Sequence, residues 1–381
     1  MRVLFVCRAI SNVAGGVERM AVSIMNELVE RGHDVSILTW DVGDEPAFYQ
    51  MDERIVWRRI DLGTPTETAS VGLRLKRALK VRQIVGELKP DVALAFQYGC
   101  FISLKLYGAG IRLPIIAAER NAPSLYDFTS AGERRNRIFQ SMRLADRITV
   151  QCESYRDMYP TYLRDKIVII PNPVFPATGR AAPAGEGASE RILLSVGRLS
   201  YQKNQHALLR AFATLRGEFP GWRLEIAGDG EEQDSLERLI GELGFGDEVR
   251  LLGAVKDVNE LYCRSHLFCL SSRWEGFPNA LAEAMARGLP AVGYADCCGT
   301  NELIVNGQTG QLAGGNGDTD SLAAALRQLM SDDAGRAAMG ESAVSAMLSY
   351  QPQSIFDRWE GLLADVAGRP LASARAVDAA A

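Results

Sequence analysis

Residues 273–285 read RWEGFPNALAEAM, and this stretch sets two carboxylates on either side of an expected helix start. Glu275 lies in a Gly/Pro loop, and Glu283 lies inside the helix expected after Pro278. A helix start carries unpaired N–H groups and a partial positive charge, so it can bind phosphate oxygens. Ionised carboxylates are strong acceptors for hydroxyl groups. A ligand with phosphate in the middle and hydroxyls at both ends is a nucleotide-sugar. The stretch therefore predicts a nucleotide-sugar as the ligand.

Two cations precede this stretch in the segment GRLSYQKN at residues 197–204. Arg198 follows an expected strand, and Lys203 lies near the start of the next expected helix. Such a pair can clamp a diphosphate, with arginine as a planar fork and lysine as a point charge. The alternative is an exposed pair at an ordinary turn. The downstream carboxylates Glu275 and Glu283 favour the diphosphate interpretation.

A second Gly-rich element, SNVAGGVE at residues 11–18, lies between the first expected strand and the first expected helix. At Gly15 and Gly16 a phosphate can approach bare backbone. The element is not G-x-G-x-x-G, and no acidic residue follows at dinucleotide spacing, which disfavours a Rossmann dehydrogenase. Glu18 is equally explained as a first-turn carboxylate that the helix dipole favours.

The pattern of apolar runs predicts an α/β fold with parallel sheets, because amphipathic helical patterns separate the strands. In a first domain, residues 1–176, we expect strands at 2–7, 35–40, 91–96, 114–118, 147–151 and 166–170. A helix at 17–31 is expected to end at Gly32, a residue typical of helix C-termini.

The pattern restarts after residues 172–190, which are rich in Pro, Gly and Ala and predict a linker, placed at 177–190. The second domain, residues 191–351, has expected strands at 192–196, 223–227, 249–252, 267–270 and 291–293, with helices at 205–216 and 231–243. A final helix at 352–366, within a segment 352–381, is expected to pack back on the first domain. Two such domains imply a cleft, with ligands at the carboxyl ends of the strands.

Composition excludes several classes of protein. A chain of 381 residues is too long for one ordinary hydrophobic core, so about two domains are expected. The hydrophobic (47%) and charged (23%) fractions are those of a soluble globular protein. No apolar run approaches the ~20 residues that cross a bilayer. The seven cysteines, without C-x-x-C or Cys/His ligand spacing, predict reduced cytosolic thiols rather than disulfides or zinc. We therefore expect a cytoplasmic protein.

Charge is uneven along the chain. Residues 1–176 hold 24 Lys/Arg against 20 Asp/Glu, whereas the remainder holds 18 against 27. This asymmetry predicts that the first domain meets something anionic. Nucleic acid is disfavoured, because the chain is acidic overall, with a net charge of −5, and shows no basic motif interleaved with aromatic residues.

Taken together, the motifs resemble those of the retaining GT-B glycosyltransferases of family 4, and the resemblance covers nearly the whole chain. It rests on GGVE at 15–18, RGHDV at 31–35, SVGR at 195–198 with Lys203, IAGDG at 226–230, the Glu275–Glu283 pair, and GQTG at 307–310. The resemblance implies the GT-B fold, in which two Rossmann-like domains with parallel sheets face each other across a cleft. It also implies a nucleoside-diphosphate sugar, UDP-linked in our prediction, as co-substrate.

The resemblance implies a role for each matching residue. Glu275 would bind donor-sugar hydroxyls, Glu283 the ribose hydroxyls, and Arg198 with Lys203 the departing diphosphate, where preorganised donors meet the developing charge. The remaining donor-binding residues would be Gly15, Gly16, Val255, Phe277, Pro278, Asn279 and Ala280. No metal and no cofactor is expected, because cations occupy the place of a metal.

The sequence departs from the pattern of the family at one place, in the part expected to bind the acceptor. Many relatives carry a histidine after the first-domain strand that faces the cleft, where this chain has Glu119, Arg120 and Asn121. This sequence resembles a subgroup that extends surface polysaccharides or undecaprenyl-diphosphate-linked oligosaccharides, and the three residues would orient the acceptor or the transferred sugar. The alternative is a buried Glu119–Arg120 ion pair. His33, His206 and His266 are interpreted as structural.

Two basic segments of the first domain, 71–82 and 133–137, suggest an anionic membrane surface as a partner. The alternative is a solvated helix face. We therefore expect a transferase of hexose or N-acetylhexosamine to a glycan, polyprenyl-diphosphate-linked, at the cytoplasmic membrane face. A UDP-sugar 2-epimerase and a non-catalytic nucleotide-sugar-binding subunit are the rival interpretations. Scarce histidines disfavour the first, and the intact Arg198, Lys203, Glu275 and Glu283 disfavour the second.

Overall fold

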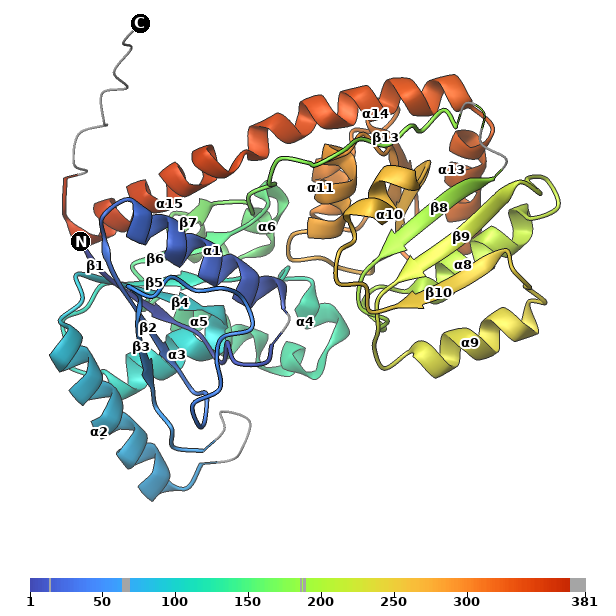
Figure 1. The fold of residues 1–381 in the computed structure, drawn as a ribbon. Helices are drawn as coiled ribbons and strands as arrows, with labels where there is room; N and C mark the ends of the chain where they lie inside the picture. Colours follow the sequence, from blue (N-terminus) through green and yellow to red (C-terminus); the bar gives the residue numbers. More distant parts are fainter. Residues whose placement is uncertain (14, 64–68, 186, 188–189, 371–381) are drawn as a thin grey trace, which may run out of the picture. The chain divides into compact units, whose positions relative to one another are not determined.

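The computed structural model describes residues 1–13, 15–63, 69–185, 187 and 190–370, and the chain forms two compact units. Unit 1 is Met1–Pro171 together with Gln353–Ala381, and unit 2 is Asn172–Pro352. Each unit contains one parallel sheet with helices on both faces (Figure 1). The α/β class and the two parallel sheets predicted from the apolar runs are confirmed.

The sheet of unit 1 has seven strands in the order β3-β2-β1-β4-β5-β6-β7. Its central strands are buried along their whole length, as expected where helices cover both faces of a parallel sheet. The strands are β1 (Arg2–Val6), β2 (Asp34–Thr39), β3 (Val56–Arg59), β4 (Val92–Phe96), β5 (Ile115–Ala118), β6 (Arg147–Val150) and β7 (Ile167–Ile169).

Two layers of helices cover this sheet. Helices α1 (Gly16–Glu30) and α15 (Pro352–Ala367) pack on one face, where they share a core with alternate residues of β1 and β2. Helices α2 (Val71–Leu88), α3 (Gln97–Tyr107) and α5 (Arg135–Met142) form the layer on the other face (Figure 1). Shorter helices complete the unit: α4 (Leu125–Phe128), η1 (Ser130–Arg134), α6 (Glu153–Met158) and α7 (Thr161–Arg164).

Helix α15 ties the end of the described chain to the core of unit 1. Its buried residues include Ile355, Phe356 and Trp359, which belong to the same cluster as Val3 and Phe5 of β1. The final helix was predicted at this position, whereas residues 371–381 of the predicted segment lie outside the described residues. The apolar stripe of α15 is thus buried against the first strand of the chain.

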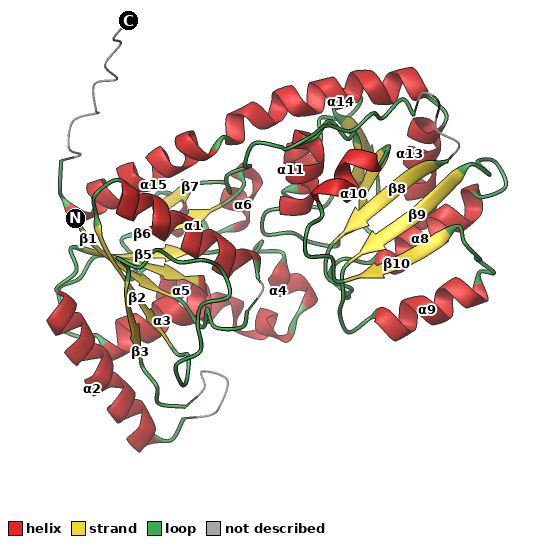
Figure 2. Ribbon diagram, in the orientation of Figure 1, coloured by secondary structure: helices red, strands yellow, loops and turns green. Residues whose placement is uncertain are grey.

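The sheet of unit 2 has six strands in the order β10-β9-β8-β11-β12-β13, with helices along both faces (Figure 2). The strands are β8 (Arg191–Val196), β9 (Trp222–Ala227), β10 (Val249–Gly253), β11 (Leu267–Leu270), β12 (Ala291–Tyr294) and β13 (Gly310–Ala313). Helices α8 (Gln205–Leu215), α9 (Gln233–Glu242) and α13 (Thr319–Met330) share one core cluster. The others are α10 (Asn259–Arg264), α11 (Asn279–Ala286), α12 (Thr300–Leu303), α14 (Asp333–Met347) and η2 (Leu348–Tyr350).

Two edge strands were not predicted. In β3 the exposed and half-buried residues alternate along only four positions, so no continuous apolar run marks it. The strand β13 begins with Gly310, a residue that weakens a strand pattern. Its tight pairing explains the glycine, because a Cβ at Gly310 would lie 2.0 Å from the carbonyl oxygen of Ala291 on β12.

The described part of the predicted linker packs along unit 2. The N–H of Val174 donates to the carbonyl of Tyr350, and that of Ala181 donates to the carbonyl of Arg287. The buried guanidinium of Arg336 donates to the carbonyl of Pro183. Composition alone gave no sign of these contacts, because Pro- and Gly-rich segments lack apolar periodicity.

Two remaining features of the fold are the state of the cysteines and the apolar character of the helices. All seven cysteines lie in the described residues, and none forms a disulfide. Across the ranges that the structure describes, no helix has both the length and the apolar character needed to cross a membrane.

The packing of α15 gives a testable prediction. Replacing Trp359 with alanine should lower the free energy of unfolding of unit 1 by about 3–5 kcal/mol, because a large aromatic side chain leaves a cavity. Urea unfolding followed by circular dichroism measures the change. Ser354→Ala, at an exposed position of the same helix, is the control and should change stability by less than about 0.5 kcal/mol. A Trp359→Ala protein as stable as the parent would contradict the role of α15 in the core.

Candidate functional site

The strand order of unit 2 places two loops side by side. The order reverses between β8 and β11, which are hydrogen-bonded neighbours. Ligands of open parallel sheets bind outside the carboxyl ends of the strands at such a switch point. The loop after β8 is residues 197–204 and carries Arg198 and Lys203, and the loop after β11 is residues 271–278 and carries Glu275. The switch point therefore brings together Lys203 and Glu275, which are 72 positions apart in the sequence.

Lys203 and Glu275 form an ion pair at this point. The Lys203 Nζ lies 2.5 Å from the Glu275 Oε1, and the hydroxyl of Ser272 donates to the same oxygen. The Glu275 side chain is 4% exposed and that of Lys203 is 20% exposed. A nearly buried carboxylate is stable when a cation and a hydroxyl hold it, so its position is fixed. The structure thus joins two of the three residues predicted as catalytic.

Arg273 braces the two loops against each other. Its Nε donates to the carbonyl of Tyr201, its Nη2 donates to the Oδ1 of Asn204, and its guanidinium lies 4.4 Å from the centre of the Tyr201 ring. The Ser271 hydroxyl donates to the carbonyl of Lys203. These contacts hold the backbone on both sides of Lys203, so the cation is presented from a rigid loop.

Glycines allow a third loop to pack below the first. The loop after β9 contains Gly228 and Gly230, and the Leu199 N–H donates to the carbonyl of Asp229 at 2.7 Å. A Cβ at Gly228 would lie 2.0 Å from the carbonyl oxygen of Gly197, and one at Gly230 would lie 2.3 Å from that of Leu199. Only glycine permits this approach, which explains the motif IAGDG at 226–230 in structural terms.

Helix α11 begins where the sequence predicts, between the two carboxylates. It starts at Asn279, after Glu275 and Pro278, and Glu283 lies on its second turn. No side chain caps its N-terminus, and the Oδ1 of Asn279 accepts a hydrogen bond from Asn172. The hydroxyl of Tyr262 donates to the Glu283 Oε2 at 3.2 Å. The helix start and its dipole are therefore adjacent in sequence to the Lys203–Glu275 pair.

The other predicted residues of unit 2 lie in loops and at the start of α11. Arg198 is exposed on the same loop as Lys203, and its carbonyl accepts from the Gln205 side chain. The ring of Phe277 is buried against Tyr350. Val255 is half-buried, two residues beyond the end of β10, and Ala280 is the second residue of α11.

In unit 1 the Gly-rich element follows β1 and leads into α1. Gly15 is the N-cap of α1 and Gly16 its first residue, whereas residue 14 lies outside the described residues. Glu18 lies in the first turn, and its carboxylate folds back so closely that a Cβ at Gly15 would meet it. The structure thus agrees with the alternative that Glu18 complements the helix dipole.

Among the predicted site residues, Glu119 is the carboxyl group whose pKa is shifted by its surroundings. It follows β5 directly and is 7% exposed, and its carboxylate accepts from the Tyr98 N–H at the start of α3. Burial raises its pKa to about 7, although the hydrogen bond opposes this shift. Its Oε1 has no hydrogen-bond partner within the part of the chain that the structure describes. A buried carboxyl with an unsatisfied oxygen at the carboxyl edge of the sheet is a candidate for ligand binding.

Arg120 has a different environment from its neighbour. Its guanidinium lies 5.8 Å from the centre of the Phe96 ring and 6.0 Å from that of Trp359. Burial lowers its pKa to about 9. Asn121 is half-buried beside it. Glu119 thus contacts the start of α3, and Arg120 lies near two aromatic rings.

The three histidines all have partners within their own unit. His33 contacts Glu360 and the N-terminal amine, His206 contacts Ser235, and the Nδ1 of His266 accepts from the Ile192 N–H. Within the described ranges, no group of three His, Cys, Asp or Glu residues is arranged to hold a metal ion.

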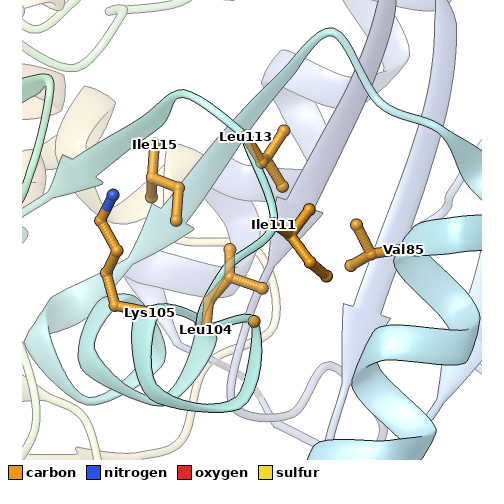
Figure 3. Close-up of a pocket in the computed structure, with 7 residues that line it drawn as sticks. Val85, Leu104, Lys105, Ile111, Leu113 and Ile115 are labelled. Atoms are coloured by element: carbon orange, nitrogen blue, oxygen red, sulfur yellow. The ribbon is translucent and has the colours of Figure 1, made fainter.

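A hollow between α2 and α3 lies apart from these residues. Its lining consists of Val85, Leu104, Lys105, Gly108, Ile111, Leu113 and Ile115, which are mostly apolar (Figure 3). Ile115 is the first residue of β5, so the hollow lies toward the amino ends of the strands. Glu119 lies at the opposite edge of the same sheet.

Sequence reasoning missed Ser271, Ser272, Gln202 and Arg273. The side chain of Gln202 donates to the carbonyl of Trp274, which is a further link between the two loops of unit 2. The available signal was positional, because Ser271, Ser272 and Arg273 follow directly on the strand 267–270. Only the pairing of β8 with β11 shows what these side chains contact.

Comparison with protein families supports the motif-based resemblance. The model of Glycosyltransferase Family 4 matches residues 14–177, and that of Glycosyl transferases group 1 matches residues 181–345. The first range includes Gly15, Gly16 and Glu119, and the second includes Lys203 and Glu275. Each unit is therefore matched by one glycosyltransferase model.

Several relatives match over nearly their whole length. An uncharacterized glycosyltransferase of Haemophilus influenzae is 26% identical over 92% of this chain and 96% of its own. An undecaprenol-linked-glycan α-1,4-N-acetyl-D-galactosaminyltransferase of Campylobacter jejuni is 25% identical over 96% and 99%. The amylovoran biosynthesis glycosyltransferase AmsD of Erwinia amylovora is 25% identical over 95% and 99%.

Solved structures share the fold. The HepE protein of Anabaena, in complex with UDP and glucose, superposes with a TM-score of 0.79 over 96% of this chain and 99% of its own, at 21% identity. Sucrose-phosphate synthase of Thermosynechococcus elongatus reaches 0.81 over 96% and 99%, at 18% identity. These likenesses, two Rossmann-like units and the family matches on both of them agree: the chain belongs to family 4 of the glycosyltransferases and has the GT-B fold.

Proposed function

We propose that this glycosyltransferase moves a hexose or N-acetylhexosamine from a UDP-sugar, with retention and without a metal, to a polyprenyl-diphosphate-linked glycan. The observation that carries the proposal is the Lys203–Glu275 ion pair at the switch point of unit 2, next to the start of α11. A cation, a helix dipole and a carboxylate meet there, and these are the groups that a diphosphate-linked sugar requires.

In the proposed reaction, Lys203 and Arg198 stabilise the departing diphosphate. An ammonium group has three N–H donors, of which Glu275 accepts one, so donors remain for phosphate oxygens. The brace of Arg273 keeps Lys203 in place before the charge develops on the leaving oxygen, which is the condition for electrostatic catalysis. These two cations supply the positive charge that a metal ion provides in other transferases, which supports metal independence.

The nearly buried carboxylate of Glu275 would accept hydroxyls of the transferred sugar, and Glu283 would accept those of the ribose. Retention would follow a front-face route, in which the leaving phosphate takes the proton of the acceptor hydroxyl. The contacts of the three histidines with Glu360, Ser235 and Ile192 support this route over a histidine base.

The donor and acceptor classes draw on the relatives. The HepE structure contains UDP and glucose, and the Campylobacter jejuni relative is named for an acceptor on PP-undecaprenol. The Erwinia amylovora relative acts in amylovoran biosynthesis. These neighbours support a UDP-sugar and a growing, lipid-linked glycan for the present enzyme.

Calorimetry tests the donor first. The purified protein is titrated, without metal, with a panel of UDP-, GDP- and ADP-sugars, and one UDP-sugar should bind with micromolar affinity. Transfer to a lipid-linked glycan with that donor, followed by NMR of the anomeric proton, then tests retention. A product with inverted configuration, or an absolute requirement for divalent metal, would overturn those parts of the proposal.

Removing the Lys203 cation should slow the transfer reaction. Lys203→Ala should lower turnover by about two to three orders of magnitude, as the loss of one preorganised donor does in other enzymes. Steady-state kinetics with saturating donor measure the change. Arg210→Ala, which removes an exposed cation from α8, is the matched control and should leave turnover unchanged. Near-normal turnover of Lys203→Ala would remove Lys203 from the mechanism.

Neutralising the carboxylate should separate transfer from nucleotide binding. Glu275→Gln keeps the side-chain volume but weakens the contacts with Lys203 and with sugar hydroxyls, so transfer should fall by more than about a hundredfold. Calorimetry should show UDP affinity within a few-fold of the parent. If UDP binding were lost as well, Glu275 would belong to the nucleotide site instead.

The raised pKa of Glu119 predicts a pH dependence. If its ionised carboxylate accepts a hydroxyl of the sugar or acceptor, kcat/KM should rise between pH 6 and 8 with an apparent pKa near 7. Glu119→Gln should have lower kcat/KM and should lose this titration. A parent profile that is flat across this range would remove Glu119 from substrate binding.

Stability supplies an independent check of the same pKa. A carboxyl whose pKa is raised on folding holds its proton in the native state but loses it in the unfolded state, so stability falls as pH rises from about 4.5 to 7. Glu119→Gln should therefore become more stable relative to the parent over this range, by up to about 3 kcal/mol. The exposed Glu133→Gln is the control, and urea midpoints at pH 5 and 8 provide the measurement.

A further inference from the structure

The helices on the two faces of the unit 1 sheet carry opposite charge. Helices α2, α3 and α5 together contain eight basic residues and one acidic residue, Glu87; the basic ones are Arg74, Lys76, Arg77, Lys80, Arg82, Lys105, Arg135 and Arg137. Helices α1 and α15 contain two basic and six acidic residues: Arg19 and Arg358, against Glu18, Glu27, Glu30, Asp357, Glu360 and Asp365. The layer α2–α3–α5 is therefore strongly cationic, although the whole chain is acidic.

The cationic layer also exposes a row of large aliphatic side chains. Val71, Leu75 and Leu79 follow at intervals of four residues on α2, and they are 84%, 62% and 61% exposed. Residues spaced in this way lie on one side of a helix. The opposite side of α2 is buried through Arg77, Val81, Ile84 and Val85. Leu106 of the neighbouring helix α3 is 66% exposed as well.

Basic side chains border this row on both sides. A helical turn of 3.6 residues places Lys76 and Lys80 on one side of Leu75 and Leu79, and Arg74 and Arg82 on the other. Arg77, by contrast, is buried and donates to the carbonyl of Leu62, so it does not belong to the surface. The pattern of an apolar centre with cationic borders is that of helices that lie in a membrane interface.

We infer that the outer surface of α2, together with α3 and α5, docks on an anionic phospholipid bilayer, with Leu75 and Leu79 inserted among the lipids. Charge complementarity selects negatively charged headgroups for the Lys and Arg side chains, which contribute about fivefold each to the partition coefficient at about 1 kcal/mol per residue. The aliphatic row distinguishes a bilayer from a soluble polyanion, because a polyanion offers no apolar surface to bury it.

The orientation of α2 relates this surface to the site. The helix of a β-α-β unit runs antiparallel to its strands, so α2 begins, with Val71, at the carboxyl edge of the sheet. Glu119 lies at that edge. If the proposed lipid-linked acceptor is the substrate, docking through α2 would bring the acceptor diphosphate toward this edge; the docking itself does not depend on that assignment.

Vesicle sedimentation tests the inference without donor or acceptor, so its outcome is independent of the proposed reaction. The full-length protein should sediment with vesicles of phosphatidylcholine and phosphatidylglycerol and not with phosphatidylcholine alone. High salt should weaken the binding, since exposed charges are screened. The triple variant Lys76→Gln/Lys80→Gln/Arg82→Gln should lower the partition coefficient about a hundredfold or more. The double variant Leu75→Asn/Leu79→Asn should lower it at least about tenfold.

Matched controls come from unit 2. Arg210→Gln/Arg238→Gln/Arg250→Gln makes the same change in net charge at exposed positions, and Val305→Asn/Leu348→Asn replaces two exposed aliphatic residues. Both controls should partition like the parent. Equal losses in a control and in the α2 variant would overturn the assignment of the surface.

Two further outcomes decide the kind of partner. If the basic triple loses binding while the leucine variant binds like the parent, the surface recognises polyanions or an acidic protein, and the bilayer inference fails. Hydrogen exchange of the parent avoids any folding defect of the variants: anionic vesicles should slow exchange in peptides of residues 71–88 and leave those of α1 unchanged. Unchanged exchange in residues 71–88 would also overturn the inference.

Discussion

The hydrogen-bonded pairing of β8 with β11 is the constraint on which the candidate site depends. It makes neighbours of two loops that lie far apart in the sequence, and it places both at the carboxyl edge of the sheet. The nearly buried carboxylate of Glu275 is stabilised by a cation and a hydroxyl. The pairing supplies the cation, Lys203, whereas the hydroxyl of Ser272 comes from the same loop as Glu275. The brace of Arg273 and the glycine contacts below the loop then remove the freedom that a long lysine side chain would otherwise have.

The carboxyl edge of unit 1 uses burial in a different way. Among the described residues no cation forms an ion pair with Glu119, so burial raises its pKa without an ion pair to offset the shift. A group that changes charge near neutral pH can serve as acceptor or donor for a hydroxyl, whereas Glu275 is held in place by its contacts with Lys203 and Ser272. The two units therefore present carboxyl groups of different character, which suits a reaction with a sugar donor and a separate acceptor.

The charge difference between the two helix layers of unit 1 was visible only in part from the sequence. The excess of basic residues in the first half of the chain predicted an anionic partner, and the two basic segments were found. The tertiary structure adds that α3 joins α2 and α5 in one layer, that Arg77 is turned inward, and that the acidic residues of α1 and α15 cover the other face. Sequence spacing cannot supply this, because the alternation of helices between the faces depends on strand order.

The sequence by itself determined the α/β class, the two parallel sheets, nearly all of the strands, the start of α11 between Glu275 and Glu283, and the family. Local signals carry these features: apolar runs, the glycine after α1, and a Gly/Pro loop before a helix. The tertiary structure decided which residues meet. The ion pair of Lys203 with Glu275, the brace of Arg273 and the separate surroundings of Glu119 and Arg120 arise from contacts between segments distant in sequence. Such contacts depend on strand order and loop packing. Neither of these produces a periodic or compositional pattern in the sequence, so local signals do not predict them.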